Sequence, residues 1–429
     1  MPLSTDIVAE LTWRGMLNQV TDEKIGEFLR EKPRVIYTGF DPTGPSLHVG
    51  HLVAIMNLRR FQRAGHRPIA LIGGATGMIG DPSGKSAERQ LLTAEAVAEN
   101  VRSLKGQMST FLDFDEKDGA LLLNNYDWMS GFSYLDFLRD VGKHFPVNVM
   151  LTKDSVKSRL AREESGLSYT EFSYMLLQSY DFVYLNRHYG CEVQAGGSDQ
   201  WGNITAGIDL ARRMASAASP LYGLTCALLT KSDGQKMGKT ESGAVWLDPN
   251  RTSPYQFYQY WVNTDDADVA KVLRFFSDLG EEQINELLAE HEKDRGKRLP
   301  QKQVASELTA LVHGPQGLAA AERATSIFFG AEISQLDDAQ LVSIFSDVPS
   351  ASVTRARLEE GISLIDALVM THLAPSKGEA RRTIQQGGAY INNRQATEID
   401  RCLTAEDRAS ESVIVLRSGR KRYALLRLE

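Results

Sequence analysis

Between residues 34 and 230, short apolar segments alternate with amphipathic ones, and this alternation limits the fold more than any other feature of the 429-residue chain. The apolar segments have the length of strands, and the segments between them have apolar residues at helical spacing. Such an alternation favours a parallel sheet covered by helices. The sequence therefore predicts an α/β domain with strands at 35–40, 68–73, 120–124, 192–195 and 224–229.

The rest of the chain predicts two further parts. Residues 253–330 lose the strand pattern and are expected to be helical, whereas 361–429 combine two helical segments with three strand-like ones. We therefore expect a Rossmann-like domain at 1–235 that includes an N-terminal helical segment. A loop and helical domain at 236–345, a linker at 346–360 and a small α+β domain at 361–429 should follow.

The composition indicates in which kind of cellular environment the protein works. The hydrophobic content of 42% and the charged content of 24% are typical of globular proteins, and no apolar run has the length of a membrane helix. Cys191, Cys226 and Cys402 are scattered and odd in number, so we expect neither a disulfide framework nor a metal site. These features favour a cytoplasmic protein without membrane contact.

Charge is distributed unevenly along the chain. The net charge is −7, but residues 351–429 carry 13 Lys and Arg against 10 Asp and Glu. A basic C-terminal part on an acidic body suggests a local contact with a polyanion.

Two histidines stand where the first predicted strand passes into a helix. The turn Asp41-Pro-Thr-Gly-Pro-Ser-Leu-His48-Val-Gly-His51 is followed by apolar residues at helical spacing. A helix N-terminus offers unpaired N–H groups and a positive dipole end, which favour phosphate. A histidine pair alone is more often structural, but the order strand, turn and helix is the one that a nucleotide site requires.

A second polar segment carries two lysines, Lys236-Met-Gly-Lys-Thr240, in a loop rich in glycine. Solvated charge is the ordinary explanation of such a loop. Combined with the histidine turn, it predicts an ATP site over which the loop closes and from which it withdraws.

A polar row runs along an otherwise apolar helix. Tyr174, Gln178 and Asp181 are spaced i, i+4 and i+7, so they share one face. The row could face solvent, but a polar row within a buried helix needs partners. It is therefore a candidate substrate contact.

Two nucleotide-binding alternatives fit less well. The segment 80–86 is similar to a P-loop but has three residues between its glycines instead of four, and Pro82 removes an N–H donor. The segment 76–80 lacks the spacing of a dinucleotide-binding turn. A P-loop-like NTPase remains an alternative.

The two motifs resemble the HIGH and KMSKS signatures of class I aminoacyl-tRNA synthetases, in the forms His48-Val-Gly-His51 and Lys236-Met-Gly-Lys-Thr240. Longer similarities at 73–83, 169–181 and 194–203 point to the bacterial tyrosyl-tRNA synthetases. One departure is Gly238, where the general signature has serine. A tryptophanyl-type synthetase is the nearest alternative.

The resemblance implies a tyrosine–tRNA ligase that forms tyrosyl-adenylate from tyrosine and ATP, releases pyrophosphate and then esterifies tRNA(Tyr). It implies Mg²⁺ with ATP, no tightly bound cofactor and a homodimer, for which residues 134–141 are a candidate surface. The residues implied for the reaction itself are Thr43, His48, His51, Lys85, Arg89, Lys236 and Lys239. Those implied for tyrosine are Tyr37, Asp81, Tyr174, Gln178, Asp181, Gln194 and Gln200. Those implied for ATP are Gly39, Asp41, Thr43, His48, Gly50, His51, Gly197, Asp199 and Lys239.

The C-terminal part is similar to a small RNA-binding domain that the same synthetases share with a ribosomal protein. The resemblance is carried by residues 376–384 and 387–392. It implies contacts with structured RNA through Lys377, Arg381, Arg382, Arg420, Lys421 and Arg422, although ordinary surface charge would give the same pattern. The expected architecture is thus a Rossmann-like parallel-sheet catalytic domain, a helical domain and a small α+β RNA-binding domain.

Overall fold

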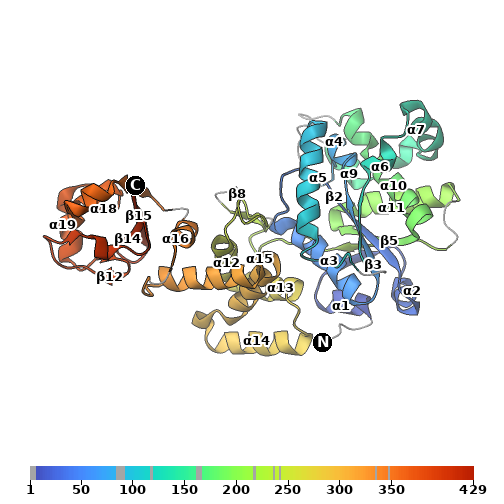
Figure 1. The fold of residues 1–429 in the computed structure, drawn as a ribbon. Coiled ribbons are helices and arrows are strands. Elements are labelled where there is room, and N and C mark those ends of the chain that lie inside the picture. The colour runs from blue at the N-terminus through green and yellow to red at the C-terminus, as the bar shows by residue number, and fades with distance from the viewer. Residues whose placement is uncertain are drawn as a thin grey trace. The chain divides into compact units, whose positions relative to one another are not determined.

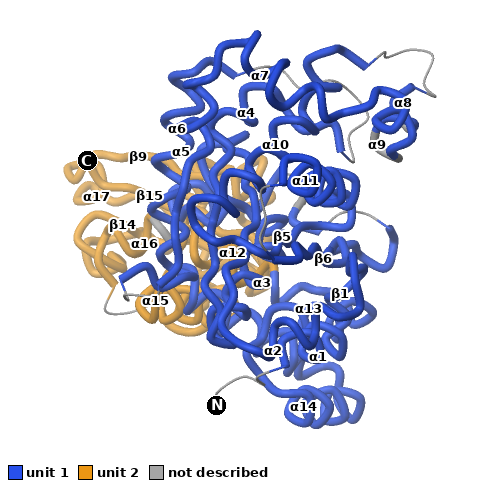
Figure 2. The backbone as a smooth tube through the Cα atoms, turned by 90° about the vertical axis from the view of Figure 1, so that its right-hand side faces the viewer, with its two compact units in different colours: residues 1–252, 261–312 blue, residues 253–260, 313–429 orange. Residues whose placement is uncertain are grey.

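The structure is a computed structural model that describes residues 6–83, 92–115, 119–160, 167–215, 219–234, 237–240, 243–333, 336–345 and 348–429. The chain divides into two compact units, 1–252 with 261–312, and 253–260 with 313–429 (Figure 2). Two helices, α12 (Pro254–Val262) and α15 (Leu299–Phe328), contain residues of both units. No helix in the described ranges combines the length and the apolar character needed to cross a bilayer.

The first unit is built on a six-stranded sheet of order β1-β6-β5-β2-β3-β4. Its strands β2, β3 and β5 are labelled in Figure 1. Neighbouring strands are parallel except at one edge, where β1 is antiparallel to β6. The inner strand β3 is buried at all but its first residue, as expected of a parallel strand covered on both faces. The strands are β1 (Leu17–Val20), β2 (Val35–Phe40), β3 (Arg67–Ile72), β4 (Leu121–Asn124), β5 (Cys191–Gly197) and β6 (Tyr222–Cys226).

Helices cover both faces of this sheet (Figure 1). Helix α3 connects β2 to β3 and α11 connects β5 to β6, in opposite directions along the sheet. Because such crossovers are right-handed, the two helices lie on opposite faces. The helices of this unit are α1 (Ile7–Trp13), α2 (Ile25–Glu31), α3 (Leu52–Arg63), α4 (Thr76–Ile79), α5 (Ala94–Met108), α6 (Tyr126–Met129), α7 (Tyr134–Asp140), α8 (Val147–Met150), α9 (Asp154–Leu160), α10 (Tyr169–Tyr189), α11 (Trp201–Arg213), α13 (Asp266–Phe276) and α14 (Glu281–Lys293).

The direction of the chain along the sheet reverses between β2 and β5. From β2 the chain proceeds to β3 and β4, whereas β5 lies on the other side of β2 and is followed outward by β6. In open parallel sheets, ligands bind at the carboxyl ends of the strands at such a reversal. The predicted Rossmann-like parallel sheet is confirmed, and its topology marks where a site should lie.

Helix α10 carries the predicted polar row. It begins after Ser168, whose side chain accepts the N–H of Glu171, and ends at Gly190 in the left-handed conformation. Its inner side packs on β2 and β3, where Phe182 meets the Tyr37 ring at 5.4 Å between centroids. This packing brings the row against the sheet.

The N-terminal segment differs from the prediction. It was expected to be helical, but β1 stands between α1 and α2 and pairs with β6 about 200 residues later. The strand has four residues, none of them fully buried, so it has little apolar pattern of its own. Its conformation is decided by a distant partner.

The second unit contains a five-stranded sheet of order β12-β11-β14-β15-β9. Only β9 and β15 are parallel, and β10 and β13 form a separate pair. Its elements after α15 are α16 (Asp338–Ile344), β9 (Ser350–Val353), α17 (Arg355–Glu359), β10 (Ile362–Ser363), α18 (Leu364–Met370), α19 (Lys377–Gln385), β11 (Ala389–Ile391), β12 (Arg394–Gln395), β13 (Cys402–Leu403), β14 (Val413–Ser418) and β15 (Arg422–Leu428).

The predicted linker at 346–360 is therefore not wholly a linker. Strand β9 and helix α17 lie within it, and β9 completes the sheet by pairing with β15. One face of that sheet also shares an apolar cluster with α15 and α16. The boundaries between the two compact units lie inside α12 and α15, whereas we predicted domain boundaries at 235 and 345. The predicted division into domains stays a prediction.

Candidate functional site

The histidine turn lies at the carboxyl end of β2. His51 Nδ1 accepts the N–H of His48 at 3.1 Å, His48 Nδ1 accepts the N–H of Gly50 at 3.0 Å, and the two ring centroids are 4.0 Å apart. Because each Nδ1 accepts, a neutral ring carries its proton on Nε2 and can donate from that atom. The turn thus fixes both imidazoles at the start of α3 (Leu52–Arg63), as the sequence predicted.

The segment that follows the lysine loop pairs with this turn. Val49 donates its N–H to Val245 O at 2.9 Å, and Leu247 donates to Leu47 O at 2.9 Å. Gly238, in the loop itself, has φ of +91°, and a Cβ there would lie 2.9 Å from the Gly50 nitrogen. Glycine at 238 therefore permits the loop backbone to lie against the histidine turn, which accounts for the departure from serine.

A cavity of about 630 Å³ opens at this end of the sheet. It is lined by predicted site residues from β2, α10 and β5, from the turns that follow these strands, and from the segment after α4. Those that line it are Tyr37, Gly39, Asp41, Thr43, His48, Gly50, His51, Asp81, Tyr174, Gln178, Asp181, Gln194, Gly197, Asp199 and Gln200. Lys85, Arg89 and Lys236 lie outside the described residues, and the side chain of Lys239, in β7 (Lys239–Thr240), is likewise not described.

One end of the cavity is arranged for a hydroxyl group. The Tyr37 hydroxyl is buried and has no hydrogen-bond partner among the described residues, and neither has Gln194 Oε1. Asp181 accepts Asn125 Nδ2 at 3.0 Å and Trp128 Nε1 at 2.9 Å. Burial raises the Asp181 pKa to about 7, although these two hydrogen bonds oppose the shift. Burial, together with the charge of Asp181, also raises the pKa of Tyr37.

A group of carbonyl and carboxylate oxygens lines another part of the cavity. Gln200 Nε2 donates to Asp81 Oδ2 at 2.6 Å, and Gln178 Nε2 donates to Gln200 Oε1 at 3.1 Å. The Tyr174 hydroxyl donates to Asp41 Oδ2 at 3.2 Å. These acceptors suit an ammonium group, which has three donors and no acceptor.

Sequence reasoning missed several side chains of this network. Asn125 Nδ2 also contacts Thr76 Oγ1 at 3.0 Å, and Thr76 Oγ1 donates to Asp41 Oδ1 at 3.1 Å. Trp128 and Asn203 bond to Asp181 and Gln178 respectively. Asn125 directly follows β4, so the rule that ligands bind at the carboxyl ends of strands was the available signal.

The six candidate RNA-binding residues are exposed in the second unit. Lys377, on α19, pairs with Asp366 at 2.7 Å. Arg422, at the start of β15, donates to His372 O at 3.0 Å. This hydrogen bond joins the β14–β15 hairpin to the connection between α18 and α19. The basic residues of the hairpin and those of α19 therefore belong to one surface region.

Two family models match the chain. One describes class I tRNA synthetases (W and Y) and matches residues 29–330, and the other describes a tyrosine–tRNA ligase SYY-like C-terminal domain and matches residues 340–426. The fold, the histidine turn and the cavity agree with this match. The chain therefore belongs to the class I tRNA synthetases.

Relatives define the family more closely. A tyrosine–tRNA ligase of Rhodopirellula baltica is 55% identical over 99% of this chain and 97% of its own, and tyrosine–tRNA ligase 1 of Bacillus subtilis is 50% identical over 98% and 99%. A truncated mitochondrial tyrosyl-tRNA synthetase of Aspergillus nidulans has a similar structure, with a TM-score of 0.68 and 30% identity over 76% of this chain and 95% of its own. Within class I, the chain belongs to the tyrosine–tRNA ligases and is an aminoacyl-tRNA synthetase.

Proposed function

We propose that this ligase recognises the phenol of tyrosine through Tyr37 and Asp181. The buried Tyr37 hydroxyl, which has no partner among the described residues, is the observation that carries this proposal. Buried polar groups are nearly always hydrogen-bonded, so a ligand hydroxyl that bonds both side chains would satisfy them. Asp81, Tyr174 and Gln178 would hold the ammonium group, with Gln194 and Gln200 beside them.

ATP would bind where the histidine turn opens α3. Thr43, His48, His51 and Lys239 would contact its phosphates, whereas Gly39, Asp41, Gly50, Gly197 and Asp199 would border the nucleotide. Lys85, Arg89 and Lys236 would supply further positive charge, and Mg²⁺ would accompany the phosphates. The tyrosine carboxylate attacks the α-phosphorus, the bond to the leaving oxygen breaks, and tyrosyl-adenylate and pyrophosphate form. Alignment and charge stabilisation can carry this step without a protein nucleophile.

In the second step the 3′-terminal ribose hydroxyl of tRNA(Tyr) attacks the tyrosyl carbonyl and AMP leaves. The exposed cations Lys377, Arg381, Arg382, Arg420, Lys421 and Arg422 would bind phosphates of the tRNA. We place this activity in the cytoplasm.

Tyrosine-dependent exchange of pyrophosphate into ATP tests the first step. We expect exchange with tyrosine and far less with any of the other nineteen standard amino acids. Tyr37→Phe should raise the KM for tyrosine roughly tenfold, because the substrate loses one buried hydrogen bond. The hydroxyl that it removes has no partner in the described structure, so the variant should fold as well as the wild type.

Asp181→Ala completes this test. It should lower the preference for tyrosine over phenylalanine. In the wild type, bound phenylalanine would leave the buried Asp181 carboxylate without a ligand hydroxyl, and this penalty disappears when the carboxylate is removed. Equal selectivity in Asp181→Ala and wild type would contradict the assignment of Asp181.

We also propose that the chain forms a homodimer through α7 and its surroundings. Tyr134 is 64% exposed and Leu135 75% exposed at the start of that helix, and Val147 on α8 is 58% exposed. Apolar groups so exposed commonly mark an interface. Leu135→Glu should convert a dimer to a monomer in sedimentation velocity, and a monomeric wild type would contradict the proposal.

A further inference from the structure

Helix α13 contacts the segment from which the lysine loop departs. Asp268, in its first turn, accepts the N–H of Ser232 at 2.8 Å, and Lys271 Nζ donates to Thr230 O at 3.1 Å. Asp268 is 5% exposed, so its carboxylate is directed into the protein. These two hydrogen bonds hold both sides of Lys231, where the loop begins after β6.

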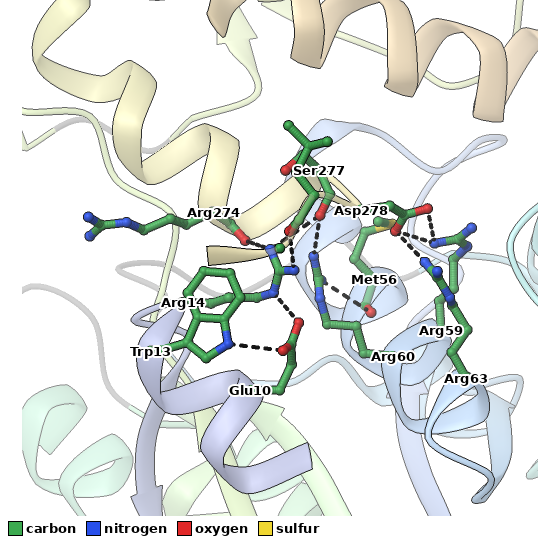
Figure 3. A network of polar contacts seen from close by, with 12 residues as sticks. Glu10, Trp13, Arg14, Met56, Arg59, Arg60, Arg63, Arg274, Ser277 and Asp278 are labelled. Carbon is green, nitrogen blue, oxygen red and sulfur yellow. Dashed lines mark hydrogen bonds and ion pairs between the residues drawn. The ribbon is translucent and has the colours of Figure 1, made fainter. Parts of the chain in front are cut away.

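The other end of α13 is held by two buried arginines (Figure 3). Arg14 donates to the carbonyls of Arg274 at 2.8 Å, Ser277 at 3.2 Å and Leu279 at 2.8 Å. Arg60 donates to the same Ser277 carbonyl at 3.1 Å. Two guanidinium groups thus satisfy carbonyls in the last turn of α13, at its C-cap and just after it, and positive charge is favourable at a helix C-terminus.

Arg60 belongs to α3, the helix that begins at the histidine turn. On the same helix, Arg59 and Arg63 pair with Asp278 at 2.7 and 2.6 Å (Figure 3). The last turns of α3 are therefore joined to the end of α13 by charged hydrogen bonds, which are stronger than neutral ones.

We propose that α13 is a support that holds the base of the lysine loop at a fixed place relative to α3 and its histidine turn, and that Asp268 and Lys271 are positioning residues for adenylate formation. This inference rests on the proposed role of the lysine loop in binding ATP. In this proposal, α13 keeps the lysine loop aligned with the reacting groups. Such alignment matters because a misplacement of about 1 Å far from the reacting atoms can slow a reaction about a hundredfold.

A carboxylate in the first turn of a helix often stabilises only that helix, through the positive end of its dipole. Asp268 differs, because it accepts an N–H from a residue 36 positions earlier in the chain. Asp265 provides the comparison: it precedes the same helix, and its side chain makes no capping hydrogen bond. Asp265→Ala therefore removes a charge from the same helix end without touching the loop base.

The experiment compares Asp268→Ala, Asp268→Asn and Asp265→Ala in the full-length chain. Asp268→Ala should lower kcat of tyrosine-dependent pyrophosphate exchange about tenfold, as expected for one hydrogen bond to a charged group, and leave the KM for tyrosine unchanged. Asp268→Asn keeps an acceptor oxygen and should restore most of the rate, while Asp265→Ala should match the wild type. Lys271→Met should act in the same direction as Asp268→Ala.

Hydrogen exchange of the Ser232 amide gives a second measurement that does not depend on activity. This amide should exchange faster in Asp268→Ala than in wild type and Asp265→Ala. An unchanged exchange rate of that amide, an unchanged kcat, or a rise in the tyrosine KM as large as the fall in kcat would overturn the proposal. A wild type without tyrosine-dependent activity would refute the proposed function instead, and the amide would still decide whether α13 holds the loop base.

Discussion

Burial acts in opposite directions on two titratable side chains of the first unit. It raises the pKa of the Asp181 carboxyl to about 7, because the charged form loses water in the cavity wall. It lowers the pKa of His66 from 6.5 to about 4, where the nearby positive charge of Arg34 acts in the same sense. Asp181 lines the cavity that faces the proposed substrate, whereas His66 is not among the residues that line it.

His66 should make the protein less stable in mild acid. Its Nδ1 accepts the N–H of Arg34 at 3.2 Å, and it is buried in the folded state. Between pH 6.5 and about 4 the unfolded chain binds a proton at His66 and the folded chain does not, so stability falls as pH falls through this interval. His66→Gln keeps an acceptor and should lose less stability, measured as the urea midpoint at pH 7 and at pH 4.5.

The exposed His188 supplies the control for this experiment. His188→Gln should show the same pH dependence as the wild type. An equal loss of stability in wild type and His66→Gln would show that His66 does not contribute.

At the scale of elements, the site is made where three backbone segments meet. The histidine turn, the segment 245–247 and Gly238 lie against one another, joined by the backbone hydrogen bonds of Val49 and Leu247. The sequence placed the histidine turn at the start of a helix, but no helix or strand pattern indicated that the loop would contact it. Their contact depends on the close approach that a glycine permits.

Gly238→Ala should slow adenylate formation more than Gly234→Ala. Both glycines have positive φ, at +91° and +82°, so both variants carry a similar backbone strain of about 1–2 kcal/mol. Only at 238 would the new Cβ meet the Gly50 nitrogen, at 2.9 Å, whereas at 234 nothing lies within 4 Å. Single-turnover formation of pyrophosphate measures the difference, and equal rates in the two variants would show that this contact has no role.

At the scale of the whole molecule, all described residues of the cavity belong to the first unit, and the candidate RNA-binding residues belong to the second. The second unit is larger than the predicted domain at 361–429. Ile327 of α15 and Phe345, which directly follows α16, share an apolar cluster with Val415 and Leu425 of the sheet. The Tyr423 hydroxyl also donates to Ile327 O at 3.1 Å. A chain cut near residue 350 would expose this cluster, so point substitutions test the RNA role more cleanly.

Replacing Arg420 and Lys421 together by alanine should weaken tRNA binding without changing pyrophosphate exchange. If both contact phosphates, the slope of log affinity against log salt should fall by roughly 1 for each. The control replaces Arg355 and Arg357, exposed residues of the same unit, and removes the same charge. Equal salt slopes for the two double variants would contradict specific contacts at the hairpin.

Much of the fold could be predicted because it is recorded in local patterns. Strand β2 coincides with its prediction, and β3 and β4 differ from theirs by a single residue at one or both ends. The polar row at Tyr174, Gln178 and Asp181 faces the cavity, as its spacing within an apolar helix indicated. Burial of one face of a helix or strand produces a periodic pattern of apolar residues, which can be read without knowing the distant segments that cover that face.

The remaining features depend on segments far apart in the chain. Strands β1 and β9 are short, and their partners β6 and β15 lie about 200 and 75 residues later. Asn125 and Trp128 reach Asp181 from another helix and loop. No local periodicity encodes such contacts, because each requires the sheet to be assembled first.

By itself, the sequence determined the alternation of strands and helices, the histidine turn at a helix start, the polar face of α10 and the family. Only the tertiary structure decided which groups are buried without partners, which carbonyls Arg14 and Arg60 satisfy, and that α13 meets the base of the lysine loop. The physical reason is that helix and strand patterns arise from neighbours along the chain, whereas desolvation and hydrogen-bond pairing depend on what packing places within a few ångströms.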